Sequence, residues 1–381
     1  MSDAESEIHH FLATRPSRLE PEARLGHQLA MDRSQQNSGT SAVREGLGFD
    51  AGALDAWMAR EIEDYRGPLR VAQFKGGQSN PTYRLDTPAR AYVLRRKPPG
   101  KLLPGAHAVD REYRVLTALG AQGFPVARTY GLCLDEEVIG TAFYVMEMVE
   151  GRIFWEPSLP ELGAAERPAY FDAMNSALAQ LHLIDPEAAG LGDYGKPGNY
   201  FARQIGRWSK QYEADVEAGR VPAMDRLAEW LPANIPPDEP QPRVIHGDFR
   251  CDNMIFHASE PRILAVLDWE LSTLGHPLAD FSYHLMMYRM PDALAGRDLI
   301  ALNIPSEADY VAAYCRRTGR EGIADLDFYM AFNLFRLAGI VHGIKGRVVR
   351  GTAASAHAAE MAQRLEPLAE LGWAQAVKAG A

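Results

Sequence analysis

The stretch HGDFRCDN at residues 246–253, followed by ILAVLD at residues 263–268, is the most informative part of this chain. A short apolar pair precedes it, so Asp248 is predicted to lie where a strand gives way to a loop. Asn253 comes five residues later, before a second apolar run, and Asp268 ends a third. This spacing predicts two carboxylates and one amide gathered around a single loop.

These three side chains have the chemistry that phosphoryl transfer requires. A carboxylate must orient an attacking hydroxyl and accept its proton, and oxygen ligands must fix magnesium across the nucleotide phosphates. Asp248 suits the first role, and Asn253 and Asp268 suit the second. The alternative is a polar turn in which His246, Asp248 and Asn253 only satisfy one another and nearby backbone. The complete spacing favours the transfer site.

The pattern HxDxxxxN, followed by an apolar strand that ends in Asp, resembles the catalytic and metal-binding loops of the aminoglycoside phosphotransferase and choline kinase family. The resemblance implies ATP and Mg²⁺ as cofactors, Asp248 as the catalytic aspartate, and Asn253 and Asp268 as metal ligands. It also implies an α+β, two-lobed protein-kinase-like fold. The N-lobe should be a small antiparallel β-sheet with a helix, and the C-lobe should be larger and mainly helical.

The composition of the chain limits the folds and partners that are possible. With 381 residues, of which 46% are hydrophobic, the chain can bury a large core and should form more than one lobe. The formal net charge of -10 argues against a nucleic-acid partner. No run approaches the roughly 20 apolar residues of a membrane helix, and a secretory signal is absent, so we expect no membrane partner and a cytoplasmic protein. The three cysteines lack CxxC spacing, which argues against a disulfide framework or a zinc site.

The polarity of the chain suggests where its domains begin. Residues 1–48 are polar, and we expect a flexible N-terminal extension there. Asp50 is a candidate N-cap for a first helix. We therefore expect a nucleotide-binding N-lobe over residues 49–149 and a catalytic, acceptor-binding C-lobe over residues 150–381.

The run KGGQSN at residues 75–80 lies between two short predicted strands, where a kinase covers the nucleotide phosphates. Adjacent glycines let backbone amides approach an anion closely. The alternative is an ordinary hairpin turn, because the run lacks GxGxxG spacing. The predicted phosphate contacts are Gly76, Gly77, Ser79 and Asn80.

Residues 91–97 alternate as a strand, which places Arg95 and Lys97 on the same face. A basic residue here should bind the nucleotide phosphates. The family usually has Lys at the position aligned with Arg95, although choline kinases resemble this chain in using Arg. Whether Arg95 or Lys97 makes the contact stays open.

A helix predicted over residues 109–119, ending at Gly120, carries Glu112 within its apolar stripe. A carboxylate in such a stripe needs a cationic partner, and Arg95 is the obvious candidate. This pair would match the ion pair between strand lysine and helix glutamate in kinases. The alternative places Glu112 at the edge of the stripe, in contact with water.

Two more expectations follow from the resemblance. Residues 142–151 should be a strand leading into the hinge between the lobes, where the backbone near Glu147, Met148 and Val149 would hydrogen-bond the adenine ring. Asp280 should brace the catalytic loop through backbone hydrogen bonds.

The acceptor is harder to predict. An aminoglycoside pocket should concentrate carboxylates, yet residues 331–351 and 195–210 carry basic side chains and no acidic one. The alternative is that these are solvated helix faces. The chain also resembles the kinase-like domain fused to certain acyl-CoA dehydrogenases, which implies a hydroxyl acceptor on an acyl-CoA or hydroxy acid. The predicted acceptor contacts are Glu270, Tyr200, Arg203, Arg207 and Arg336.

The sequence therefore predicts an ATP-dependent small-molecule phosphotransferase that transfers the γ-phosphoryl group to an acceptor hydroxyl, with a hydroxyacyl-CoA or hydroxy acid as the favoured acceptor. Two alternatives stay open. One is an aminoglycoside or amino-alcohol kinase, and the other is a catalytically silent pseudokinase that only binds a nucleotide or metabolite. The sequence leaves the oligomeric state open.

Overall fold

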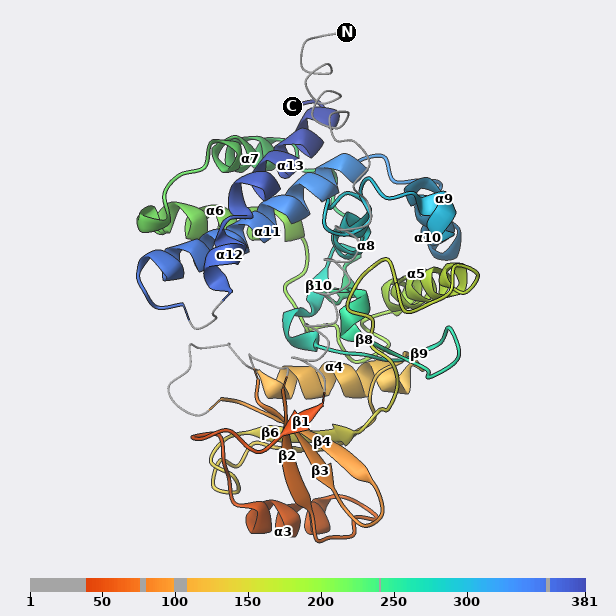
Figure 1. Cartoon of the computed structure of the whole chain (residues 1–381), viewed down its shortest axis with the longest axis vertical. Helices are drawn as coiled ribbons and strands as arrows, with labels where there is room; N and C mark the ends of the chain where they lie inside the picture. Colours follow the sequence, from red (N-terminus) through yellow and green to blue (C-terminus); the bar gives the residue numbers. More distant parts are fainter. Residues whose placement is uncertain (1–38, 76–79, 99–107, 240, 354–356) are drawn as a thin grey trace.

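The computed structural model describes residues 39–75, 80–98, 108–239, 241–353 and 357–381. These residues form two lobes (Figure 1), a smaller one built on an antiparallel sheet and a larger one built mainly of helices. The predicted α+β, two-lobed fold is confirmed.

The N-lobe sheet has six antiparallel strands in the order β1-β2-β3-β4-β6-β5. The strands are β1 (Thr40–Ser41), β2 (Arg70–Phe74), β3 (Thr82–Asp86), β4 (Ala91–Arg96), β5 (Thr129–Cys133) and β6 (Phe143–Glu147). Strands β2 and β3 flank the predicted phosphate loop, and β6 leads into the predicted hinge. The sheet thus places both segments that are predicted to bind the nucleotide in one lobe.

Helix α3 (Ala51–Glu61) covers one face of this sheet, and Asp50 caps it by accepting the backbone N–H groups of Gly52 and Ala53, as predicted. The sheet begins before the predicted boundary at residue 49, because β1 pairs with β2. The phenol of Tyr83 also donates to the carbonyl of Leu47. Residues near position 40 therefore belong to the N-lobe, and the boundary predicted from polarity is too late.

Helix α4 (Val109–Ala121) covers the other face of the sheet. It continues past the predicted end at residue 119 and includes Gly120. The glycine with a left-handed backbone is Gly123, which follows the helix and has a φ of +74°. The apolar residues of α4 belong to the same hydrophobic core as the C-lobe. The helix is thus packed between the lobes, which fixes the position of Glu112 relative to the catalytic loop.

The C-lobe is built around α11, the longest helix of the described chain, which packs against α6, α7, α8 and α13. No described helix is long and apolar enough to cross a membrane. The helices of this lobe are α5 (Arg167–Leu183), α6 (Tyr200–Ala214), α7 (Pro222–Ala233), α8 (Pro277–Leu285), α9 (Leu299–Leu302), α10 (Glu307–Thr318), α11 (Leu326–Val349), α12 (Ala358–Ala362) and α13 (Leu365–Lys378).

Two small antiparallel pairs place the residues around the catalytic loop. Strand β7 (Arg243–Ile245) pairs with β10 (Thr273–Gly275), and β8 (Met254–Phe256) pairs with β9 (Ile263–Val266). The predicted catalytic loop runs from β7 to β8, and Asp268 follows β9. Because β8 and β9 are hydrogen-bonded neighbours, Asn253 and Asp268 lie at adjacent strand ends.

Candidate active site

Asp280, in the first turn of α8, holds the start of the catalytic loop by hydrogen bonds to its backbone. Its carboxylate accepts the backbone N–H of His246 at 2.7 Å and that of Gly247 at 2.8 Å, which confirms the predicted bracing role. Burial alone would raise the pKa of Asp280, but hydrogen bonds and nearby positive charge, first from His182, leave it lowered. Asp280 is therefore a buried anion that stays charged and fixes the start of the loop.

His246 connects the loop to the strand that leads to Asp268. Its imidazole is buried, accepts the N–H of Asp248 on Nδ1 at 3.2 Å, and donates from Nε2 to the carbonyl of Leu267 at 2.8 Å. These two bonds assign the proton to Nε2. This ring is not placed to act as a general base, because both of its nitrogens already have hydrogen-bond partners; it joins two segments of the site.

Asp248 lies at the surface of this framework with its side chain one-fifth exposed (20%). Its Oδ1 accepts the phenol O–H of Tyr283 at 2.5 Å and lies 3.3 Å from Nε of Arg250. Its Oδ2 accepts the amide of Asn253 at 3.0 Å. The carboxylate is thus oriented by donors from the loop itself and from α8.

The amide of Asn253 makes two bonds to Asp248 from one nitrogen, to the backbone carbonyl at 2.9 Å and to Oδ2 at 3.0 Å. Within the described residues no protein group donates to its Oδ1, so the amide oxygen is available to a cation. The N–H of Leu267 donates to the carbonyl of Asn253 at 2.8 Å, which holds Asp268 beside it. Asp268 has a φ of +66°, a left-handed conformation that Asp and Asn adopt more readily than other non-glycine residues.

Arg95 is the centre of charge between the lobes. Its Nε lies 2.7 Å from Oε2 of Glu112, and its Nη2 lies 2.9 Å from Asp268 and 3.4 Å from Glu270. The predicted pair of Arg95 and Glu112 is confirmed. It is a charge contact more than a well-aligned hydrogen bond, since Nε does not meet the angular requirement for one.

Glu112 does not reach water, because its side chain is only 3% exposed. It also accepts the amide of Asn80 at 2.7 Å and the phenol of Tyr144 at 3.1 Å. Burial raises the pKa of Glu112 despite the attraction of Arg95. Burial opposes the charge on Arg95, but the three carboxylates, first Glu112, raise its pKa, and the guanidinium stays charged.

This arrangement fits a magnesium ion. One guanidinium faces the carboxylates of Glu112, Asp268 and Glu270, so negative charge is in excess. Among the described residues no three or more His, Cys, Asp or Glu side chains cluster as metal ligands. Magnesium does not need such a cage, because it usually takes one or two protein oxygens and completes its shell with phosphates and water. Asn253 and Asp268 are the two residues that would supply such oxygens.

The predicted nucleotide contacts are only partly described. Gly76, Gly77 and Ser79 lie outside the described residues, and Asn80 is buried against Glu112. Of the predicted hinge residues, Glu147 is the last residue of β6, and Met148 and Val149 follow it; the N–H of Glu147 donates to the carbonyl of Arg128 at 2.8 Å. Lys97 is half-buried and directly follows β4. The predicted contacts of these residues with a nucleotide stay predictions.

The predicted acceptor residues fall into two groups. Glu270 and Arg336 reach the site, since Glu270 faces Arg95 and Arg336 donates to the carbonyl of Gly247 at 2.8 Å. The other three belong to α6. Tyr200 is buried (7% exposed) against Gly275, so it does not present its ring to solvent; Arg203 donates to the carbonyls of Lys196 and Pro197; Arg207 lies over the ring of Trp208.

Two residues of the site were not predicted. Tyr283 lies three residues after Asp280 on α8, so the helical repeat places it on a neighbouring face, which is a signal that the sequence did contain. Arg250 is inside the quoted loop, two residues after Asp248, and its guanidinium also pairs with Asp252 at 2.9 Å. Tyr283 donates a hydrogen bond to Oδ1 of Asp248, and Arg250 forms an ion pair with the same oxygen.

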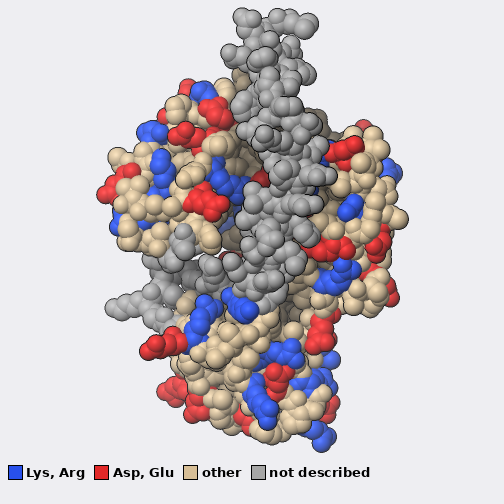
Figure 2. Space-filling view, in the orientation of Figure 1, with Lys and Arg blue, Asp and Glu red and all other residues tan. Residues whose placement is uncertain are grey.

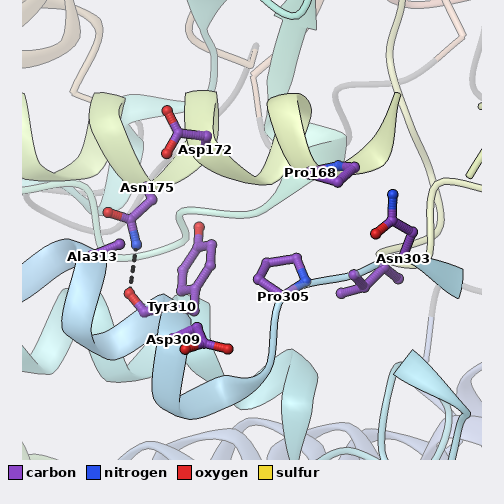
Figure 3. Close-up of a pocket in the computed structure, with 9 residues that line it drawn as sticks. Pro168, Asp172, Asn175, Asn303, Pro305, Asp309, Tyr310 and Ala313 are labelled. Carbon is purple, nitrogen blue, oxygen red and sulfur yellow. Dashed lines mark hydrogen bonds between the residues drawn. The ribbon is translucent and has the colours of Figure 1, made fainter. Parts of the chain in front are cut away.

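A cavity of about 220 Å³ lies between α5 and α10, away from the catalytic loop (Figure 3). None of the described site residues lines it. Its wall contains Tyr310, whose phenol donates to His284, and His284 donates to the carbonyl of Phe249 in the catalytic loop at 3.1 Å. Burial lowers the pKa of His284 to about 4, so this link is a neutral one.

One turn further along α10, Tyr314 makes a second contact with a histidine. Its phenol oxygen lies 2.7 Å from Nδ1 of His182, and Nε2 of His182 donates to Asp280 at 3.3 Å. A cavity of about 370 Å³ opens beside these two side chains. Both cavities therefore border the supports of the catalytic loop, while the loop itself faces the space between the lobes.

The face of the molecule in Figure 2 mixes basic and acidic side chains over both lobes.

Comparison with known proteins agrees with this geometry. The model of a family described as a phosphotransferase enzyme family matches residues 70–329. The chain belongs to this phosphotransferase family. A Ralstonia eutropha protein assigned to the aminoglycoside phosphotransferases is 52% identical, with a TM-score of 0.81 over 87% of this chain and 99% of that one. Spectinomycin phosphotransferase APH(9)-Ia, in complex with ADP and spectinomycin, is 12% identical with a TM-score of 0.58, covers 86% of this chain and 98% of its own, and shares the fold alone.

Among curated proteins, this phosphotransferase-family chain is similar to acyl-CoA dehydrogenase family member 11 of Gallus gallus. The two are 46% identical over 346 residues, which is 88% of this chain and 44% of the relative. Family member 10 of Mus musculus is 41% identical over 382 residues, covering 98% of this chain and 35% of the relative. The chain thus spans less than half the length of these relatives, and their full activity belongs to larger proteins.

Proposed function

We propose that this chain transfers the γ-phosphoryl group of ATP to a hydroxyl group of a small molecule. The observation that carries the proposal is the meeting of Asp248, Asn253 and Asp268 around one loop, opposite the guanidinium of Arg95. Membership in the phosphotransferase family supports the same reaction class.

The proposed roles follow from where each charge lies. Asp248 would align the acceptor hydroxyl and receive its proton, and Asn253 and Asp268 would hold magnesium through their oxygens. Magnesium, when bound, neutralises charge on the nucleotide phosphates. Arg95 would then contact a phosphate in place of part of its ion pair with Asp268. Glu112 would keep the guanidinium in position. Arg250, beside Asp248, would stabilise negative charge on the group in transfer.

The remaining nucleotide contacts are proposed from the sequence. The backbone at Gly76 and Gly77, with Ser79, would cover the phosphates, and the backbone from Glu147 to Val149 would bind adenine. Asn80 supports this region indirectly, since its amide donates to Glu112.

We favour an anionic acceptor, such as a hydroxyacyl-CoA or hydroxy acid. Arg250 is half-exposed (51%) next to Asp248, and Arg336 lies against the loop at Gly247. A polycationic aminoglycoside would meet these guanidinium groups at the point of transfer, which is unfavourable. The names of the curated relatives, which associate similar chains with acyl-CoA dehydrogenases, point to the same class.

An acceptor screen tests this choice. ADP formation would be measured with MgATP and four acceptor classes, namely hydroxyacyl-CoAs, aminoglycosides, choline and homoserine. Because Arg250 lies beside Asp248 and Arg336 lies against the same loop, we expect turnover with the hydroxyacyl-CoAs. Turnover only on cationic acceptors would reject the anionic class, and nucleotide binding without turnover on any acceptor would indicate a silent binding module.

Asp268→Asn should weaken the binding of MgATP by about tenfold or more, because a carboxylate ligand of the cation is lost. Asparagine tolerates the left-handed backbone at this position, so the substitution should not disturb the loop. Titration calorimetry with MgATP measures the effect, and Asp248→Asn is the matched control. Equal losses of affinity in the two variants would contradict the proposed division of roles.

A further inference from the structure

The two oxygens of Asp248 are held differently. Oδ1 accepts the phenol O–H of Tyr283 at 2.5 Å, and it also lies 3.3 Å from Nε of Arg250 in an ion pair that is not aligned as a hydrogen bond. Oδ2 accepts the amide of Asn253 at 3.0 Å. A carboxylate oxygen offers about two lone-pair positions. Oδ1 therefore has the shorter bond and the cation beside it, whereas Oδ2 has one longer bond and keeps a position for another donor.

Tyr283 can hold Oδ1 in this way because α8 supports it. The same helix carries Asp280 in its first turn, and Asp280 accepts hydrogen bonds from the backbone of the catalytic loop. The phenol of Tyr283 and the loop are therefore both attached to α8. Burial and the nearby carboxylate of Asp248 raise the pKa of Tyr283. The phenol thus remains a protonated donor throughout the ordinary working range of pH.

Arg336 of α11 fixes Tyr283 from the other side. Its guanidinium carbon lies 5.2 Å from the centroid of the tyrosine ring, and its Nη2 donates to the carbonyl of Gly247 at 2.8 Å. Gly247 itself has a φ of +85° and no room for a Cβ, which would come 2.9 Å from the carbonyl of Leu271. The loop, the tyrosine and the arginine are consequently held as one unit.

We infer that Tyr283 is a positioning residue for phosphoryl transfer, which holds Oδ1 of Asp248 so that Oδ2 receives the proton of the acceptor hydroxyl. The inference rests on the proposed function. In the step, a bond forms between the acceptor oxygen and the γ-phosphorus, the bond from that phosphorus to the β-γ bridging oxygen breaks, and ADP leaves with its electron pair. The hydroxyl proton passes to Oδ2. Tyr283 keeps its own proton and acts only through Asp248.

A transition-state analogue tests the inference without a known acceptor. MgADP with tetrafluoroaluminate mimics the group in transfer, and a water molecule takes the place of the acceptor. Titration calorimetry would compare the affinity for MgADP alone with the affinity for MgADP plus tetrafluoroaluminate, in the wild-type chain and in Tyr283→Phe. We expect unchanged MgADP affinity in the variant, and a gain from tetrafluoroaluminate that is about tenfold smaller, because one charge-assisted hydrogen bond to Asp248 is lost.

Tyr288→Phe is the matched control. Tyr288 is a buried tyrosine five residues along the chain, and its phenol donates to the carbonyl of Pro305 at 3.0 Å instead of to Asp248. This variant should keep the full gain from tetrafluoroaluminate. Arg336→Met removes the support of the tyrosine ring. Like Tyr283→Phe, it should keep its affinity for MgADP and show a smaller gain in affinity from tetrafluoroaluminate.

The possible failures are distinguishable. A full gain in Tyr283→Phe, or an equal loss in Tyr288→Phe, would overturn the inference and leave the proposed function in place. A wild-type chain that binds no MgADP, or that gains nothing from tetrafluoroaluminate, would overturn the proposed function and the inference with it.

Discussion

Asp248→Asn should lower kcat for the acceptor found in the screen by at least about a hundredfold, while the affinity for MgATP stays nearly intact. An amide cannot take the proton of the attacking hydroxyl. The substitution keeps the size of the side chain, and its carbonyl oxygen can still accept the phenol of Tyr283. The loss should therefore appear in the transfer step and spare nucleotide binding, because Asp268 and Arg95 are unchanged.

Steady-state kinetics with varied ATP and varied acceptor would separate these effects. Arg250→Gln is a useful comparison, since it removes a charge beside Asp248 but leaves the carboxylate. A kcat within tenfold of the wild type in Asp248→Asn would contradict the role of this carboxylate as the proton acceptor.

Arg95→Met should reduce the free energy of unfolding by about 3–5 kcal/mol, because it leaves the buried carboxylate of Glu112 without its cation. The pKa of Glu112 is already raised by burial and would rise further without the guanidinium. A folded state that holds this proton more tightly than the unfolded chain loses stability as the pH rises above the ordinary glutamate value of 4.5. The difference in the free energy of unfolding between the wild type and Arg95→Met should thus grow from mildly acidic toward neutral pH.

Denaturant titration at two pH values measures this effect. Arg84→Met is the matched control, because Arg84 lies on the neighbouring strand β3 and pairs with Asp86 at 2.8 Å where both side chains are much more exposed (32% and 46%). Its loss should cost at most about 1 kcal/mol. Similar losses in the two variants, with no dependence on pH, would contradict a buried ion pair at Arg95.

The sequence predicted those parts of the site that local patterns determine. Glu112 was assigned a cationic partner because a charge in an apolar helical stripe must be compensated, and the structure places Arg95 there. Asp280 was assigned to the catalytic loop, and it accepts two of its backbone N–H groups. The first prediction depends on a simple rule of burial, and the second on the resemblance to the phosphotransferase family.

The parts that were not predicted depend on how distant segments pack. Tyr283 reaches Asp248, 35 positions away in the sequence, only because α8 begins under the loop. Tyr200 was expected at the acceptor surface, but the first turn of α6 presses its ring against Gly275 of β10. No local pattern contains either contact. The end of α4 was misplaced for a similar reason, since a glycine inside a packed helix looks like a helix terminus in sequence.

The tyrosine and histidine contacts from α10 connect this helix to the catalytic loop. Tyr310 and Tyr314 are one helical turn apart; through His284 the first supports Phe249 in the middle of the catalytic loop, and through His182 and Asp280 the second supports its start. A small shift of α10 along its axis would move both points together. Substitutions on the outer surface of this helix could thus alter the speed of catalysis at long range, leaving every group that meets the nucleotide untouched.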